Sequence, residues 1–130
     1  MSVRLFRVIL PVTGIDHAAR FYAALLSMPG IRVSSGRHYF NCGGTILACV
    51  EPLAEKDGRT ARPNQDHVYF AVPDLEAVFE RAKTSGCGEL DDSIKMRFWG
   101  ERSFYAKDPF GNPICFVDET TMYVGQHPVE

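Results

Sequence analysis

Two apolar stretches decide the fold of this chain: RVILPV at residues 7–12 and HVYFAV at residues 67–72. Both are rich in β-branched and other apolar residues, which is typical of strands. Each is followed by apolar side chains at helical spacing, over residues 15–26 and 75–82. The second copy starts 60 residues after the first, and strand and helix keep this offset. The sequence therefore contains a structural repeat.

The repeat continues beyond the helices. In the first copy, short strands are predicted at residues 31–34, 38–42 and 45–50, with turn residues between them. In the second copy, a weak strand near residues 88–90 precedes a hairpin whose strands flank the turn DPFGN at 108–112. We therefore expect an α+β fold made of two βαβββ modules.

The predicted modules share one domain that covers residues 1–130. Module one spans about residues 3–51 and module two about residues 67–118. The linker, residues 52–66, is rich in charged residues, proline and glycine, as expected of a surface connection. The tail, residues 119–130, has no clear pattern. It fits a short strand, an arm that contacts a partner, or a frayed end.

Composition limits the classes of partner. The net charge of −2, without long blocks of like charge, argues against nucleic-acid binding, and no apolar stretch is long enough to span a membrane. Cys42, Cys49, Cys87 and Cys115 form no C-x-x-C pair, and the N-terminus lacks the build of an export signal. We therefore expect a cytoplasmic protein with reduced thiols and a small-molecule partner.

Together with the repeat, three motifs carry a resemblance to a known family: FY at 21–22, WGER at 99–102 and DPFGN at 108–112. The chain resembles the vicinal-oxygen-chelate superfamily, which contains glyoxalases, extradiol dioxygenases and bleomycin-resistance proteins. The resemblance implies that the two modules form a half-open mixed-sheet barrel around a ligand cavity, and that the protein is a homodimer. Whether the modules pair within one chain or swap between chains stays open.

The resemblance also implies a divalent metal held by the first and last strands of each module. His67 stands at one such position, but its counterpart Arg7 has no lone pair to donate. The other two positions fall on Cys115 and on either Leu47 or Ala48. Because a catalytic metal needs about three protein ligands, no metal cofactor is expected.

A metal is expected only if His67 recruits a further ligand such as Glu51. Without a metal, His67 is a hydrogen-bonded cavity residue or the candidate acid–base catalyst. The expected state of Cys115 is a small buried residue.

Alternation along the strands predicts which side chains face the cavity. Arg7 is costly to bury unpaired, so it should meet a ligand anion or a protein carboxylate, for which Asp66, Asp108 and Glu51 are the candidates. The predicted ligand-binding residues are Arg7, Ile9, Tyr39, His67, Tyr69, Trp99, Arg102 and Cys115.

Three functions fit these observations. The leading hypothesis is metal-independent binding of a small aromatic or amphipathic molecule, such as a drug, in a cavity completed by dimerisation, in the manner of bleomycin-resistance proteins. The second is a glyoxalase- or dioxygenase-like metalloenzyme that uses His67. The third is a metal-free enzyme in which His67 is the acid or base and Arg7 orients an acidic substrate.

Overall fold

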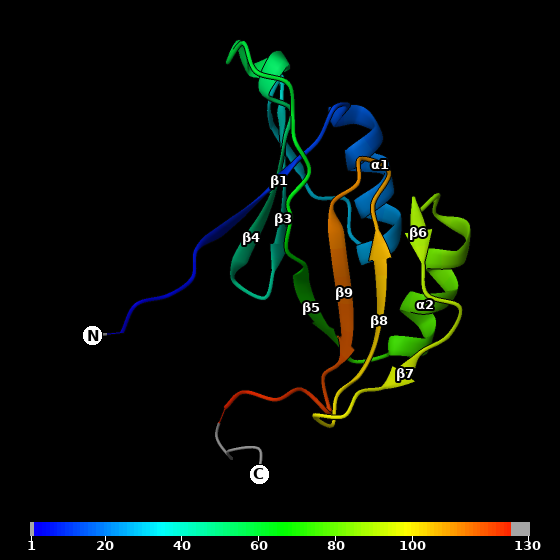
Figure 1. Cartoon of the computed structure of the whole chain (residues 1–130). Coiled ribbons are helices and arrows are strands. Elements are labelled where there is room, and N and C mark those ends of the chain that lie inside the picture. Colours follow the sequence, from blue (N-terminus) through cyan, green and yellow to red (C-terminus); the bar gives the residue numbers. More distant parts are fainter. Residues whose placement is uncertain (1, 126–130) are drawn as a thin grey trace. The chain divides into compact units, whose positions relative to one another are not determined.

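The computed structural model describes residues 2–125 of the chain (Figure 1). Its internal contacts divide the chain into two units, Met1–Asn64 and Gln65–Glu130. Each unit contains one α-helix and one mixed β-sheet. The prediction that both belong to a single domain stays a prediction.

The first unit has a four-stranded sheet in the order β1-β4-β3-β2. β1 and β4 are parallel, whereas the pairs β3–β4 and β2–β3 are antiparallel. Its elements are β1 (Arg7–Pro11), α1 (Ile15–Leu26), β2 (Ile31–Ser34), β3 (Arg37–Cys42), β4 (Thr45–Val50) and the 3₁₀-helix η1 (Pro52–Glu55).

One face of this sheet packs on α1. Leu10, Phe40 and Leu47 point to this face and are buried, and the rings of Tyr22 and Phe40 lie 6.3 Å apart. The N-cap residue of α1, Gly14, has no side chain to accept a hydrogen bond. Glu51 supplies the acceptor instead, since its Oε1 lies 2.8 Å from the backbone nitrogen of Ile15.

The second unit repeats this plan with a five-stranded sheet. Its order is β5-β9-β8-β6, and β7 also pairs with β8. β5 and β9 are parallel, while β8 pairs antiparallel with β9, β6 and β7. Its elements are β5 (Val68–Val72), α2 (Leu75–Thr84), β6 (Glu89–Leu90), β7 (Lys95–Met96), β8 (Arg102–Lys107) and β9 (Pro113–Asp118).

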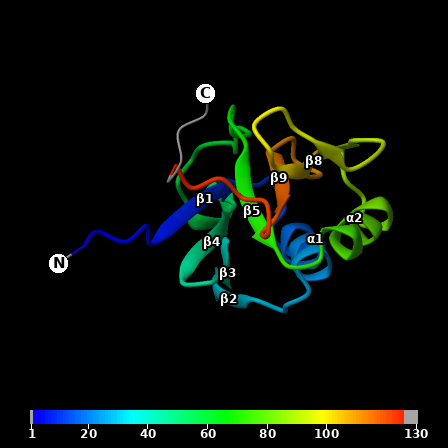
Figure 2. The same ribbon diagram turned by 90° about the horizontal axis from the view of Figure 1, so that it is seen from below.

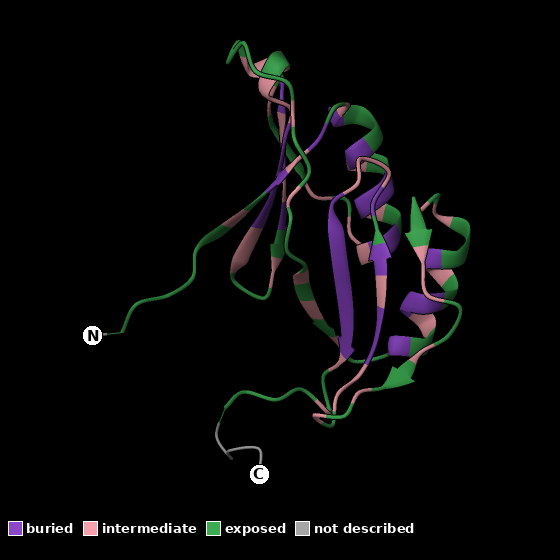
Figure 3. Cartoon of the chain, viewed as in Figure 1, coloured by how far each residue is buried: buried purple, intermediate pink, exposed green. Residues whose placement is uncertain are grey.

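Stacked phenylalanines form the core of the second unit, with Phe116 between Phe70 and Phe104. Phe79 of α2 meets Phe104 edge-on at 5.0 Å, so this face of the sheet is the helix side. α2 lies beside β8 and β9 in both ribbon views (Figures 1 and 2). β9 is buried along almost its whole length (Figure 3), as expected of a central strand with apolar residues on both faces.

The predicted α+β class with two βαβββ modules is confirmed, and the sheets are mixed and not closed. Two details differ from the prediction. The apolar pattern of residues 3–12 predicts that the first strand starts at Val3, but it begins only at Arg7 and residues 3–6 are exposed. The polar loop before the last strands contains β7. Part of the predicted tail is also described: residues 119–125 contain a turn at Glu119–Thr121, and residues 126–130 lie outside the described part.

Within residues 2–125, neither α1 nor α2 has the length and apolar character that crossing a bilayer requires.

Candidate functional site

The face of the first sheet opposite α1 carries three of the predicted ligand-binding residues. Strand register aligns Ile9 with Ala48 and Ala48 with Tyr39, so their side chains share one face. Arg7 and Arg37 belong to the same alternating set. Arg7, Ile9 and Tyr39 therefore lie together on this face, which alternation predicted for Arg7 and Ile9.

A cavity of about 780 Å³ opens on this face. Its floor is Ile9, Pro11, Val50 and Pro52, with Arg37 at one side, and residues 57–62 form a wall. This volume lies within the roughly 300–1,000 Å³ of ordinary small-molecule sites. The wall belongs to the predicted surface linker. Sequence reasoning missed it because loop composition does not show which way a loop folds.

Arg7 makes no ion pair with a carboxylate among residues 2–64. Its guanidinium carbon lies 4.8 Å from the ring centroid of Phe6 and 5.2 Å from that of Tyr39. Glu51 binds the start of α1, and Asp108 accepts hydrogen bonds within its own turn. The expected pairing of Arg7 with Glu51 is therefore wrong, because Arg7 lies at an exposed strand end and stacks on rings. Asp66 and Asp108 belong to the second unit, and the pairing of Arg7 with either of them stays a prediction.

In the second unit, register places Tyr69, Cys115 and Tyr105 side by side on the face opposite α2. Tyr69 is 57% exposed, whereas Cys115 is fully buried and offers no surface to a ligand. Desolvation, together with a hydrogen bond to Tyr105, raises the pKa of Tyr69 to about 12. Tyr69 therefore remains a neutral phenol at ordinary pH.

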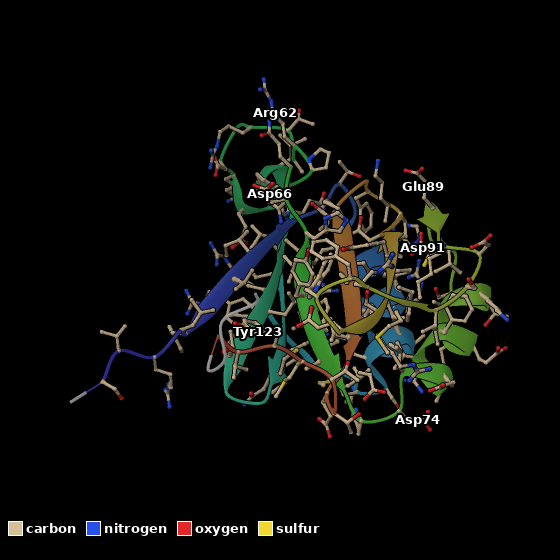
Figure 4. All side chains as sticks on the ribbon, turned by 60° about the horizontal axis from the view of Figure 1, so that its bottom comes forward. Arg62, Asp66, Asp74, Glu89, Asp91 and Tyr123 are labelled. Carbon is tan, nitrogen blue, oxygen red and sulfur yellow. The ribbon has the colours of Figure 1, made fainter. Side chains whose placement is uncertain are left out.

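A polar network that was not predicted from the sequence contacts this row of side chains at Tyr105. The Arg97 guanidinium lies 3.1 Å from Asp91, donates to the Ser103 hydroxyl at 2.8 Å, and stacks 4.5 Å from the Tyr105 ring centroid. Asp91 also accepts a hydrogen bond from the backbone nitrogen of Tyr105. Asp91 lies just after β6 in Figure 4. The network could not be predicted from the sequence because Asp91 lies in a loop, and the local sequence pattern does not show which loop residues contact one another.

His67 borders a separate hollow of about 190 Å³ together with Glu89, Asp91, Tyr105 and Lys107. Its ring lies 4.7 Å from that of Tyr105 and 6.0 Å from that of Tyr69. This hollow is much smaller than the cavity of the first unit, so it suits a small fragment or a few water molecules.

Two residues that were predicted to line the cavity, Trp99 and Arg102, make polar contacts within the second unit. Trp99 lies in the turn between β7 and β8, where its indole nitrogen donates to Glu101 at 2.7 Å. Arg102 was expected to line the cavity, but its guanidinium bonds Asp118 at 2.7 Å and Glu76 of α2 at 2.6 Å. The expectation for Arg102 is wrong because alternation in β8 points its side chain to the helix side.

The positions that hold metal in the resembling family do not provide a donor set here. Ala48 pairs with Ile9 as Cys115 pairs with Tyr69, so the undecided position falls on Ala48 rather than Leu47. Arg7 and Ala48 cannot coordinate a cation, and Cys115 is buried as a thiol. Among residues 2–125, no group of three or more His, Cys, Asp and Glu side chains has the arrangement of a metal site.

Burial also sets the chemistry of Cys115. Desolvation raises the pKa of its thiol to about 11 from an ordinary 9.0, although the hydrogen bond to Ser103 and the charge of Arg97 act in the opposite direction. A raised pKa in the folded state stabilises the protonated protein. That stabilisation is complete below pH 9 and is lost as the pH rises through 11.

We therefore expect the free energy of unfolding to fall by about 2 kcal/mol between about pH 9 and pH 11 because of Cys115. Urea denaturation at several pH values measures this fall, and Cys115→Ala should show a shallower one. The phenol of Tyr69, whose pKa is raised from 10.0 to about 12, adds a further fall above about pH 10 that is the same in both proteins. Equal slopes for the two proteins would refute the assignment to Cys115.

Comparison with known proteins agrees with this architecture. The profile of the Glyoxalase/Bleomycin resistance protein/Dioxygenase superfamily matches residues 4–116. No curated protein sequence gives a significant match.

Several solved structures share the fold. A glyoxalase/bleomycin resistance protein from Albidiferax ferrireducens T118 has a TM-score of 0.74 and 21% identity, covering 87% of this chain and 96% of its own. A glyoxalase-related enzyme from Fulvimarina pelagi has a TM-score of 0.74 and 18% identity, covering 95% and 93%. A lactoylglutathione lyase from Agrobacterium tumefaciens has a TM-score of 0.68 and 18% identity, covering 90% and 94%.

At these identities the likeness to solved structures concerns the fold alone, whereas the profile match spans most of the sequence. The chain therefore belongs to the Glyoxalase/Bleomycin resistance protein/Dioxygenase superfamily.

Proposed function

We propose that this protein binds a small molecule without a metal, as a sequestering protein in the manner of bleomycin-resistance proteins. The observation that carries the proposal is the set of residues at the four metal positions: Arg7, Ala48, His67 and Cys115. Only His67 is an accessible donor, and one donor is too few for a catalytic metal. The 780 Å³ cavity supports the binding of a drug-sized ligand.

The test is metal retention followed by ligand binding. Purified, tag-free protein is dialysed in turn against Zn, Fe, Mn and Ni salts, and bound metal is measured by elemental analysis. We expect well below one metal per chain. Retention near one per chain that is lost in His67→Ala would contradict the proposal and favour a glyoxalase- or dioxygenase-like metalloenzyme.

A metal-free acid–base enzyme is the second candidate, and the hollow beside His67 is the observation that favours it. Asp91 and Tyr105 border the same hollow and could position the imidazole. The volume of only about 190 Å³ makes this the weaker candidate. His67→Ala would abolish turnover of a screened substrate in this case, but would leave ligand binding in the larger cavity unchanged.

We also propose a cytoplasmic location and homodimeric assembly. All four cysteines are free thiols, which suits a reducing compartment. Homodimerisation rests on the family resemblance and stays a prediction.

A further inference from the structure

The cavity of the first unit combines an apolar floor with charged walls. Ile9, Pro11, Val50 and Pro52 provide the floor, which suits the apolar body of a ligand. The charged side chains of the lining are Arg37, Arg59, Arg62 and Asp57. Three arginines thus face one carboxylate.

Ion pairs neutralise only part of this charge. Arg59 bonds both oxygens of Asp57, at 2.6 and 2.7 Å, and the Nε of Arg37 lies 3.0 Å from Glu55. Arg62 makes no ion pair with a carboxylate among residues 2–64. Its side chain is exposed and extends outward from the loop that lines the cavity (Figure 4). The lining therefore carries an excess positive charge.

A second uncommitted guanidinium lies on the same sheet face. Arg7 stacks on Tyr39, and the hydroxyl of Tyr39 accepts a hydrogen bond from Nη1 of Arg37 at 2.9 Å. The rings of Phe6 and Tyr39 restrict Arg7 without using its hydrogen-bond donors. A guanidinium held by stacking, with its donors free, is prepared for a bidentate bond to an anionic oxygen group.

We infer that the cavity takes an acidic ligand, with an apolar body over Ile9 and Val50 and an anionic group bound by Arg62 of the lining, or by Arg7, which lies outside the lining on the same sheet face, two residues before Ile9 in β1. The inference rests on the proposed function and adds the chemical class of the ligand. Carboxylate, phosphate and sulfonate groups share the required geometry. A cationic ligand is disfavoured by the excess of arginine in the lining.

Two fluorescent probes with the same aromatic skeleton test the inference. 8-Anilinonaphthalene-1-sulfonate carries a sulfonate, and N-phenyl-1-naphthylamine lacks it. Both are titrated into the full chain, into Arg7→Gln and Arg62→Gln, and into the double variant. Arg20→Gln is the matched control, because Arg20 is an exposed arginine on α1 outside the cavity lining. Near-ultraviolet circular dichroism verifies that each variant is folded.

We expect the sulfonate probe to bind roughly tenfold more tightly than the neutral probe, and its affinity to fall as salt is added. The double variant should lose most of this preference, while its affinity for the neutral probe and the affinities of Arg20→Gln stay within about twofold of wild type.

The outcomes separate the inference from the proposed function. Equal affinities for the two probes, or a sulfonate preference that survives in the double variant, would overturn the acidic-ligand inference and leave metal-free binding intact. Failure of both probes to bind the wild-type protein would overturn the inference and the proposed binding function together.

Discussion

Asp108→Ala is expected to lower the free energy of unfolding by about 3 kcal/mol. Asp108 is fully buried at the turn between β8 and β9. Its Oδ1 accepts from the backbone nitrogens of Phe110 and Asn112 at 2.9 and 2.8 Å, and its Oδ2 accepts from the Asn112 amide at 2.9 Å. Alanine would leave these donors without acceptors in a site closed to water. Urea denaturation measures the loss.

The matched control is Asp92→Ala, which removes a carboxylate whose side chain is 89% exposed and paired only at the surface. We expect that control to cost less than about 0.5 kcal/mol. Asp108→Asn should fall between the two, because its amide oxygen can still serve the backbone donors while its NH₂ group opposes that of Asn112. A loss below about 1 kcal/mol in Asp108→Ala would show that water or a relaxed turn satisfies the donors.

The second large effect is expected for Arg97→Ala, at about 2 kcal/mol. Arg97 joins Asp91, Ser103 and the Tyr105 ring, and the side chains of Arg97 and Asp91 are only 15% and 25% exposed. Removal of the guanidinium leaves the carboxylate of Asp91 half-buried without its counter-ion. Chemical denaturation measures the change in stability, and loss of the stacking contact should alter the near-ultraviolet circular dichroism of Tyr105.

Lys95→Ala is the control for this prediction, because Lys95 makes an exposed ion pair with Asp92 in the same β-hairpin. Its expected cost is at most about 0.5 kcal/mol. If Arg97→Ala were no more destabilising than Lys95→Ala, the network would contribute nothing measurable to the second unit.

The secondary structure and the duplication could be predicted from the sequence because they depend on local spacing. The 60-residue offset between residues 7–12 and 67–72 corresponds to β1 and β5, each followed by a helix. Alternation also predicted that Arg7 and Ile9 share a face, whereas the strand register of the structure places Tyr39 on it. The sequence also showed that position 7 cannot ligate a metal, because an arginine side chain has no lone pair to donate.

Tertiary structure alone decided which loop residues meet the sheets. The linker segment 57–62 became a cavity wall, Asp91 met Arg97 to form a half-buried pair, and Arg102 turned to the helix side. None of these contacts has a sequence period, because loops follow no fixed repeat and their partners lie far along the chain. The sequence by itself determined the repeated fold and the loss of metal donors, whereas long-range packing decided where the charged side chains of the site lie.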